Sequence, residues 1–134
     1  MSSPIAILAV LLPVLAGFAL PFVPGHRAAA RGAILAAAAC FLLCCALPWE
    51  KPGQGWLVPD HLGMALAILT SFTGLSTAWF SAGYIDRECT AGRMGRGAAR
   101  LYHGAFPFLL GALIAALLSD NIGLTWIAVE AATI

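Results

Sequence analysis

Residues 4–23, PIAILAVLLPVLAGFALPFV, form an apolar run without a single charged side chain. An α-helix needs about 20 mostly apolar residues to cross the hydrocarbon core of a bilayer, so this run predicts a transmembrane helix. It lacks the basic segment with which a secretory signal peptide begins, because the first positive charges, Arg27 and Arg31, follow the run. We therefore expect a retained helix with its N-terminus outside.

Three further apolar runs have the same character and predict helices over residues 28–47, 61–84 and 101–118. A fifth run, residues 121–134, is shorter than one crossing of the membrane. The segments between the runs are rich in proline, glycine and charge, as expected of connections. Pro13 and Pro107 lie inside runs, where we interpret them as kinks. The predicted fold is all-α: a polytopic membrane helix bundle with four transmembrane helices and an incomplete fifth.

The composition supports the same fold class. Hydrophobic residues make up 61% of the 134 residues and charged residues only 10%, against about 25% charged in soluble domains. So few charges cannot cover the surface of a soluble globule, whereas a surface facing lipid needs none. The net charge of +1 excludes a broad basic face, so we expect no nucleic-acid partner.

Arginine placement predicts the orientation in the membrane. The segment after the first run carries Arg27 and Arg31, whereas the segment after the second carries Glu50, Lys51 and Asp60. The segment after the third run carries four arginines: Arg87, Arg93, Arg96 and Arg100. Because arginine and lysine collect in cytoplasmic loops, the first and third connections are expected in the cytoplasm.

Several polar residues have an ordinary structural interpretation. Cys40, Cys44 and Cys45 fall inside one apolar run, where buried thiols pack as small hydrophobic groups, and we expect no metal site there. Asp60 is expected to cap a helix, and His103 to lie at the membrane interface. Small and hydroxyl-bearing residues recur at helical spacing in the third run: Thr70, Thr73, Gly74, Thr77 and Ser81. Such a pattern favours helix packing, and a hydrated path is the alternative.

Glu130 is the residue most indicative of function. It comes nine residues after Asn121, a good helix-capping residue, which places it about 13 Å into the helix and near the middle of the membrane. A carboxylate at that depth costs roughly 2.5–3.5 kcal/mol, so it is rarely present without a use. Burial favours the neutral form of a carboxyl group and a nearby cation favours the charged form, which suits a proton relay. A structural glutamate at a helix contact is the alternative.

Two stretches resemble a known family. Residues 101–134, LYHGAFPFLLGALIAALLSDNIGLTWIAVEAATI, resemble the fourth and fifth helices of the antiporter-like subunits of respiratory complex I. Such subunits also occur in membrane-bound hydrogenases and in multisubunit cation/proton antiporters. Residues 58–85, VPDHLGMALAILTSFTGLSTAWFSAGYI, are similar to the third helix of that family. The sequence around Glu130 is most similar to the F subunit of hydrogenase-4 and formate hydrogenlyase. The resemblance covers residues 57–134.

This resemblance implies a role for Glu130 as the fifth-helix glutamate of a proton channel. The family pairs that glutamate with a lysine on a broken seventh helix. This sequence departs from the pattern, because its sole lysine, Lys51, lies in a connection on the outer side. We interpret residues 1–134 as the N-terminal part of a proton-translocating membrane domain, or as a truncated gene product.

The resemblance implies a proton-translocating subunit of a hydrogenase-4-like or complex I-like oxidoreductase in a bacterial-type inner membrane. Its expected partners are other subunits of the complex, the lipid bilayer, and H⁺ or Na⁺. Redox chemistry is expected in other subunits, so we expect no cofactor and no catalytic residue in this chain. The alternatives are a monovalent cation/proton antiporter subunit and a structural membrane subunit without transport.

Overall fold

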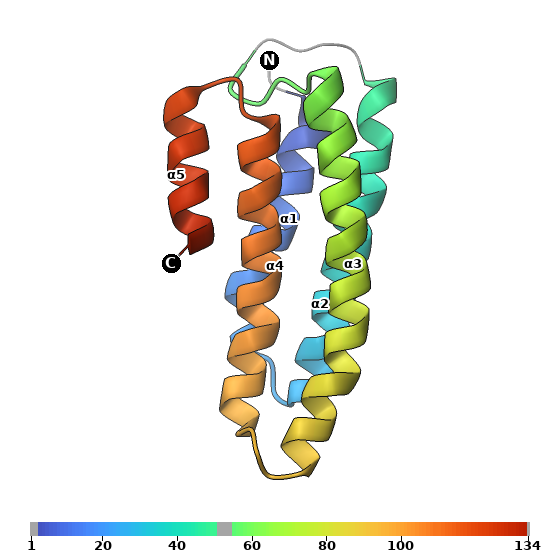
Figure 1. Cartoon of the computed structure of the whole chain (residues 1–134), viewed down its shortest axis with the longest axis vertical. Helices are drawn as coiled ribbons and strands as arrows, with labels where there is room; N and C mark the ends of the chain where they lie inside the picture. Colours follow the sequence, from blue (N-terminus) through green and yellow to red (C-terminus); the bar gives the residue numbers. More distant parts are fainter. Residues whose placement is uncertain (1–2, 51–54, 134) are drawn as a thin grey trace.

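A computed structural model describes residues 3–50 and 55–133, and its regular elements are helices apart from one isolated β-bridge. Four long helices run side by side, and a shorter fifth lies beside α4 (Figure 1). In chain order the elements are α1 (Pro4–Ala19), η1 (Leu20–Phe22), α2 (His26–Ala46), η2 (Leu47–Trp49), α3 (His61–Thr90), α4 (Arg96–Leu118) and α5 (Ile122–Thr133).

Four helical segments of the described chain are long and apolar enough to cross a membrane: Pro4–Phe22, His26–Trp49, His61–Thr90 and Arg96–Leu118. The fifth, Ile122–Thr133, is shorter. The predicted all-α membrane bundle is therefore confirmed. Successive helices run in opposite directions, so the α1–α2 and α3–α4 connections share one end of the bundle (Figure 1).

The helices around the third connection are longer than the sequence predicts. α3 continues past residue 84 to Thr90, and α4 begins at Arg96 rather than at residue 101. The turn between them closes as a Schellman motif, in which the Arg93 N–H donates to the Glu88 carbonyl (3.0 Å) and the Gly92 N–H to the Cys89 carbonyl (3.2 Å). Gly92 has φ +72°, which an L-residue with a side chain rarely adopts. The charged residues therefore extend the helices beyond the apolar runs.

Small residues let the helices approach closely at the centre of the bundle. Buried alanines make up much of the core, with Leu110, Ile114 and Leu118 of α4 between them. α1 and α4 share an extensive contact, in which Gly17 of α1 lies against Gly104 and Phe108 of α4. Such close approach of backbones is typical of helix packing in membranes, where dispersion contacts replace the hydrophobic effect.

The opposite end of the bundle is held by caps and a short backbone pairing. Asp60 caps α3, as predicted, by accepting the Gly63 N–H at 2.7 Å. Leu57 and Ser119 form an antiparallel bridge, so the segment before α3 is hydrogen-bonded to the junction of α4 and α5. Pro13 and Pro107 lie buried inside α1 and α4, and whether they kink these helices stays a prediction.

Candidate functional site around Glu130

α5 begins where the sequence predicts. The Asn121 side-chain oxygen accepts the backbone N–H groups of Gly123 (2.8 Å) and Leu124 (3.3 Å), so Asn121 is the capping residue. Glu130 is eight residues beyond the first residue of α5, which corresponds to about 12 Å along the helix axis. The helix thus carries the carboxyl group away from the polar end of the bundle.

Only one face of α5 is covered by the described chain. Ala128 is buried, and Leu124, Thr125, Ala131 and Ala132 are partly buried on the same side, where α5 packs on α4. Glu130 lies about 200° around the helix from Ala128, since each residue turns the helix by about 100°. It is exposed and points away from α4.

Among the described residues, Glu130 has no partner for a charged carboxylate. Within residues 3–50 and 55–133, its side chain makes no hydrogen bond or ion pair, and its backbone carbonyl accepts the Thr133 hydroxyl at 2.9 Å. The same face of α5 carries Trp126, one helical turn earlier and 64% exposed. Lys51, the sole lysine, lies outside the described residues, as does Ile134 at the end of the predicted fifth run.

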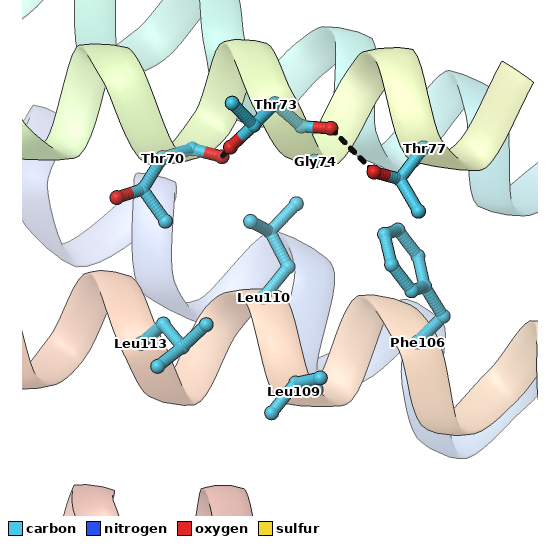
Figure 2. A pocket seen from close by; sticks show the side chains of 8 residues that line it. All are labelled: Thr70, Thr73, Gly74, Thr77, Phe106, Leu109, Leu110 and Leu113. Atoms are coloured by element: carbon cyan, nitrogen blue, oxygen red, sulfur yellow. Dashed lines mark hydrogen bonds between the residues drawn. The ribbon is translucent and has the colours of Figure 1, made fainter.

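A groove between α3 and α4 collects three of the four hydroxyl residues that recur at helical spacing in the third apolar run. The fourth, Ser81, does not line the groove, and its hydroxyl donates to the Ala78 carbonyl at 3.2 Å. Thr70, Thr73 and Thr77 line a cavity of about 160 Å³ opposite leucines of α4 and Phe106 (Figure 2). The Thr73 hydroxyl donates to the Thr70 carbonyl at 2.9 Å, and the Thr77 hydroxyl to the Thr73 carbonyl at 2.8 Å. Gly74 is buried against Leu110, which agrees with helix packing. The hydroxyls of Thr73 and Thr77 are thus engaged by their own helix.

His103 is buried inside the bundle, which the sequence interpretation did not foresee, and its place at the membrane interface stays a prediction. Its side chain is 2% exposed, and its Nε2 atom has no hydrogen-bond partner among the described residues. The ring of Tyr102 lies edge-on to it, with centroids 5.4 Å apart. The sequence held a signal for this: His103 shares a helix face with the buried residues Pro107, Leu110 and Ile114.

An ion-pair cluster at the arginine-rich end was also missed. Asp86 of α3 accepts hydrogen bonds from the Arg27 Nε (2.9 Å) and Nη2 (3.3 Å), and its Oδ1 lies 2.9 Å from the His26 Nε2. These contacts join the start of α2 to the end of α3. In the adjoining turn, Arg93 donates two hydrogen bonds to the Glu88 carboxylate. This contact raises the pKa of the Arg93 guanidinium group.

Among the described residues, neither the cysteines nor any group of metal-ligating side chains offers a second candidate site beside Glu130. Cys40 and Cys44 are fully buried, as predicted, whereas Cys45 is only partly buried. The Cys40 thiol donates to the Ala9 carbonyl at 3.4 Å. In the part of the chain that the structure describes, no three His, Cys, Asp or Glu side chains are grouped to hold a metal ion.

Comparison with known proteins gives one informative match. The chain is 40% identical over 85 residues to the hydrogenase-4 component F homolog of Methylacidiphilum infernorum (isolate V4). The matched part covers 63% of this chain but 18% of that relative, so the chain spans less than a fifth of its length. No family model and no solved structure matches the chain. The similarity supports the resemblance to hydrogenase-4 component F.

Proposed function

We propose that this chain forms part of a proton-translocating membrane subunit of a hydrogenase-4-like oxidoreductase, with Glu130 as a proton relay. The observation that carries the proposal is the 40% identity to a hydrogenase-4 component F homolog. The four membrane-crossing helices support the membrane location, which we infer to be an inner membrane with the N-terminus outside. Electron transfer takes place in other subunits of the complex.

The placement of Glu130 supports a role beyond packing. Its side chain lies on the face of α5 that α4 leaves open, about 12 Å from the helix start. A charged carboxylate facing lipid at mid-membrane costs roughly 2.5–3.5 kcal/mol, so this face is expected to lie against other protein or water in the assembled complex.

The proposed cycle uses simple electrostatics. When a cationic side chain lies near Glu130, the carboxylate is favoured and the proton leaves to one side of the membrane. When the cation moves away, the desolvated group takes up a proton from the other side. By resemblance, the cation is a lysine of another helix, which moves as electrons pass through the complex.

Replacing Glu130 by glutamine tests the proposal. Glu130→Gln keeps the shape of the side chain but removes the titratable proton, so the complex is expected to assemble while redox-driven proton pumping in membrane vesicles falls at least tenfold. Glu130→Asp keeps the carboxyl group but shortens its reach, so partial pumping is expected.

Asp120→Asn is the matched control. It removes a carboxylate from the exposed connection just before α5, whose side chain makes no hydrogen bond in the described part of the chain. Pumping by this variant is expected to equal that of the wild type. Undiminished pumping by Glu130→Gln would remove Glu130 from the mechanism and favour the structural alternative.

A further inference from the structure

A polar pocket opens at the arginine-rich end of the bundle. Its volume is about 530 Å³, and it lies between the start of α2, the end of α3 and the start of α4. Arg27 and His26 line it from α2, Asp86 and Cys89 from α3, and Arg96 from α4. Three consecutive helices therefore contribute charged or reactive side chains to one cavity.

The positive charge of this pocket is not balanced within the described chain. Asp86 is engaged by Arg27 and His26, and Glu88, the other carboxylate at this end, is engaged by Arg93. Arg96 is exposed and makes no ion pair with any residue in the described ranges. The Asp86 contacts also hold the Arg27 guanidinium at the edge of the pocket, which lowers the entropic cost of using it.

The helix ends add to the positive field. α2 and α4 both start at this pocket, after Gly25 and Gly95, and neither start has a side-chain cap. In contrast, Ser3, Asp60 and Asn121 cap the three helices that begin at the other end. Uncapped N–H groups and the helix dipole favour an anion, and here two such ends flank the two arginines.

An apolar stripe leads from the pocket along α2 into the membrane span. Arg27 and Arg31 are exposed one turn apart, and Leu35 (69% exposed) and Leu42 (67% exposed) continue on the outer surface of the same helix. A ligand with a negative head and an apolar tail would match both parts. A free phosphate ion would use only the pocket.

We propose that this pocket binds the phosphate of an anionic membrane lipid, with Arg27 and Arg96 on the phosphate and the acyl chains along the exposed leucines of α2. Basic pockets between helices at the cytoplasmic surface suit anionic headgroups. A zwitterionic headgroup carries a compensating ammonium, which two arginines disfavour. This site is separate from Glu130 and does not depend on proton translocation.

Native mass spectrometry of the protein extracted from its own membrane in mild detergent tests the proposal. Added phosphatidylglycerol is expected to be retained more strongly than phosphatidylcholine. Arg96→Gln is expected to weaken phosphatidylglycerol retention about fivefold, the change for one arginine beside an anionic headgroup. Arg100→Gln removes the same charge from the same helix, outside the pocket, and is expected to keep wild-type retention. Equal retention of the two lipids, or equal losses in the two variants, would contradict the site.

A second measurement uses the wild-type protein and does not depend on the folding of a variant. Cys89 lines the pocket, so phosphatidylglycerol is expected to slow its reaction with a charged maleimide, and phosphatidylcholine is not. A parallel reaction with added inorganic phosphate distinguishes a lipid headgroup from a free phosphate ion as the bound anion. Protection by inorganic phosphate equal to that by phosphatidylglycerol would assign the pocket to a soluble anion and overturn the lipid assignment.

Discussion

Single residues fix how closely the helices of this bundle approach. A methyl group added at Gly104 would lie 2.5 Å from the Pro21 Cγ atom and 2.8 Å from the Gly17 carbonyl oxygen. A methyl group added at Gly17 would lie 2.6 Å from the Phe108 Cβ atom. All three distances are too short without a shift of the backbone, so these glycines set the spacing of α1 and α4.

Gly104→Ala is therefore expected to destabilise the protein by about 1–3 kcal/mol, the usual cost of overpacking. Gly83→Ala is the control, because a methyl group there meets nothing within 4 Å and alanine favours a helix over glycine by about 0.8–1 kcal/mol. Thermal unfolding in detergent should give a lower midpoint for Gly104→Ala and an equal or higher one for Gly83→Ala. Equal midpoints for Gly104→Ala and wild type would mean that α1 and α4 are not packed so closely.

The sequence predicts the position of Glu130 along its helix but not the helix face on which it lies relative to α4. The depth of Glu130 in its helix follows from counting residues after Asn121, because a capped helix has a fixed rise. The side of α5 that faces α4 does not follow, because α5 is apolar around most of its circumference. The burial of His103 was not predicted, although His103 shares a helix face with the buried Pro107.

At the scale of elements, the apolar runs predict the helices but not their ends. Length and hydropathy suffice for α1 to α4, since the membrane requires a minimum apolar length. The extra turns at the end of α3 and the start of α4 are charged, and hydropathy cannot distinguish a charged helix from a loop. Local hydrogen bonds decide there: the Thr90 hydroxyl donates to the Asp86 carbonyl at 2.8 Å, and Gly92 ends the helix.

At the scale of the whole molecule, charge is divided between the two ends of the bundle. All six arginines lie in the α1–α2 and α3–α4 connections or within two helical turns of them, and Glu50, Asp60 and Asp120 lie in the α2–α3 and α4–α5 connections. These two pairs of connections are at opposite ends of the bundle (Figure 1). This division agrees with the predicted alternation along the chain, in which arginine-rich connections lie on one side of the membrane and connections without arginine on the other. Which end faces the cytoplasm is a prediction from the arginine excess.

Two single cysteines test that orientation in a Cys89→Ser background. Ala91→Cys places a thiol in the exposed α3–α4 turn, and Asp120→Cys places one at the opposite end. A membrane-impermeant maleimide is expected to label the cysteine at 120 in intact cells, and the cysteine at 91 only in inverted vesicles. Labelling of the cysteine at 91 in intact cells would reverse the orientation.

We propose that α5 holds the Glu130 carboxyl group in the membrane interior in a form that takes up a proton. Carbodiimides react with protonated carboxyl groups, so peptide mass spectrometry of native membranes treated with a lipophilic or a water-soluble carbodiimide measures this directly. We predict that the lipophilic reagent modifies Glu130 and inhibits proton pumping, while the water-soluble reagent modifies Asp120 and leaves Glu130 unreacted. Modification of Glu130 by the water-soluble reagent at the rate of Asp120, or full pumping after Glu130 has been modified, would contradict the account.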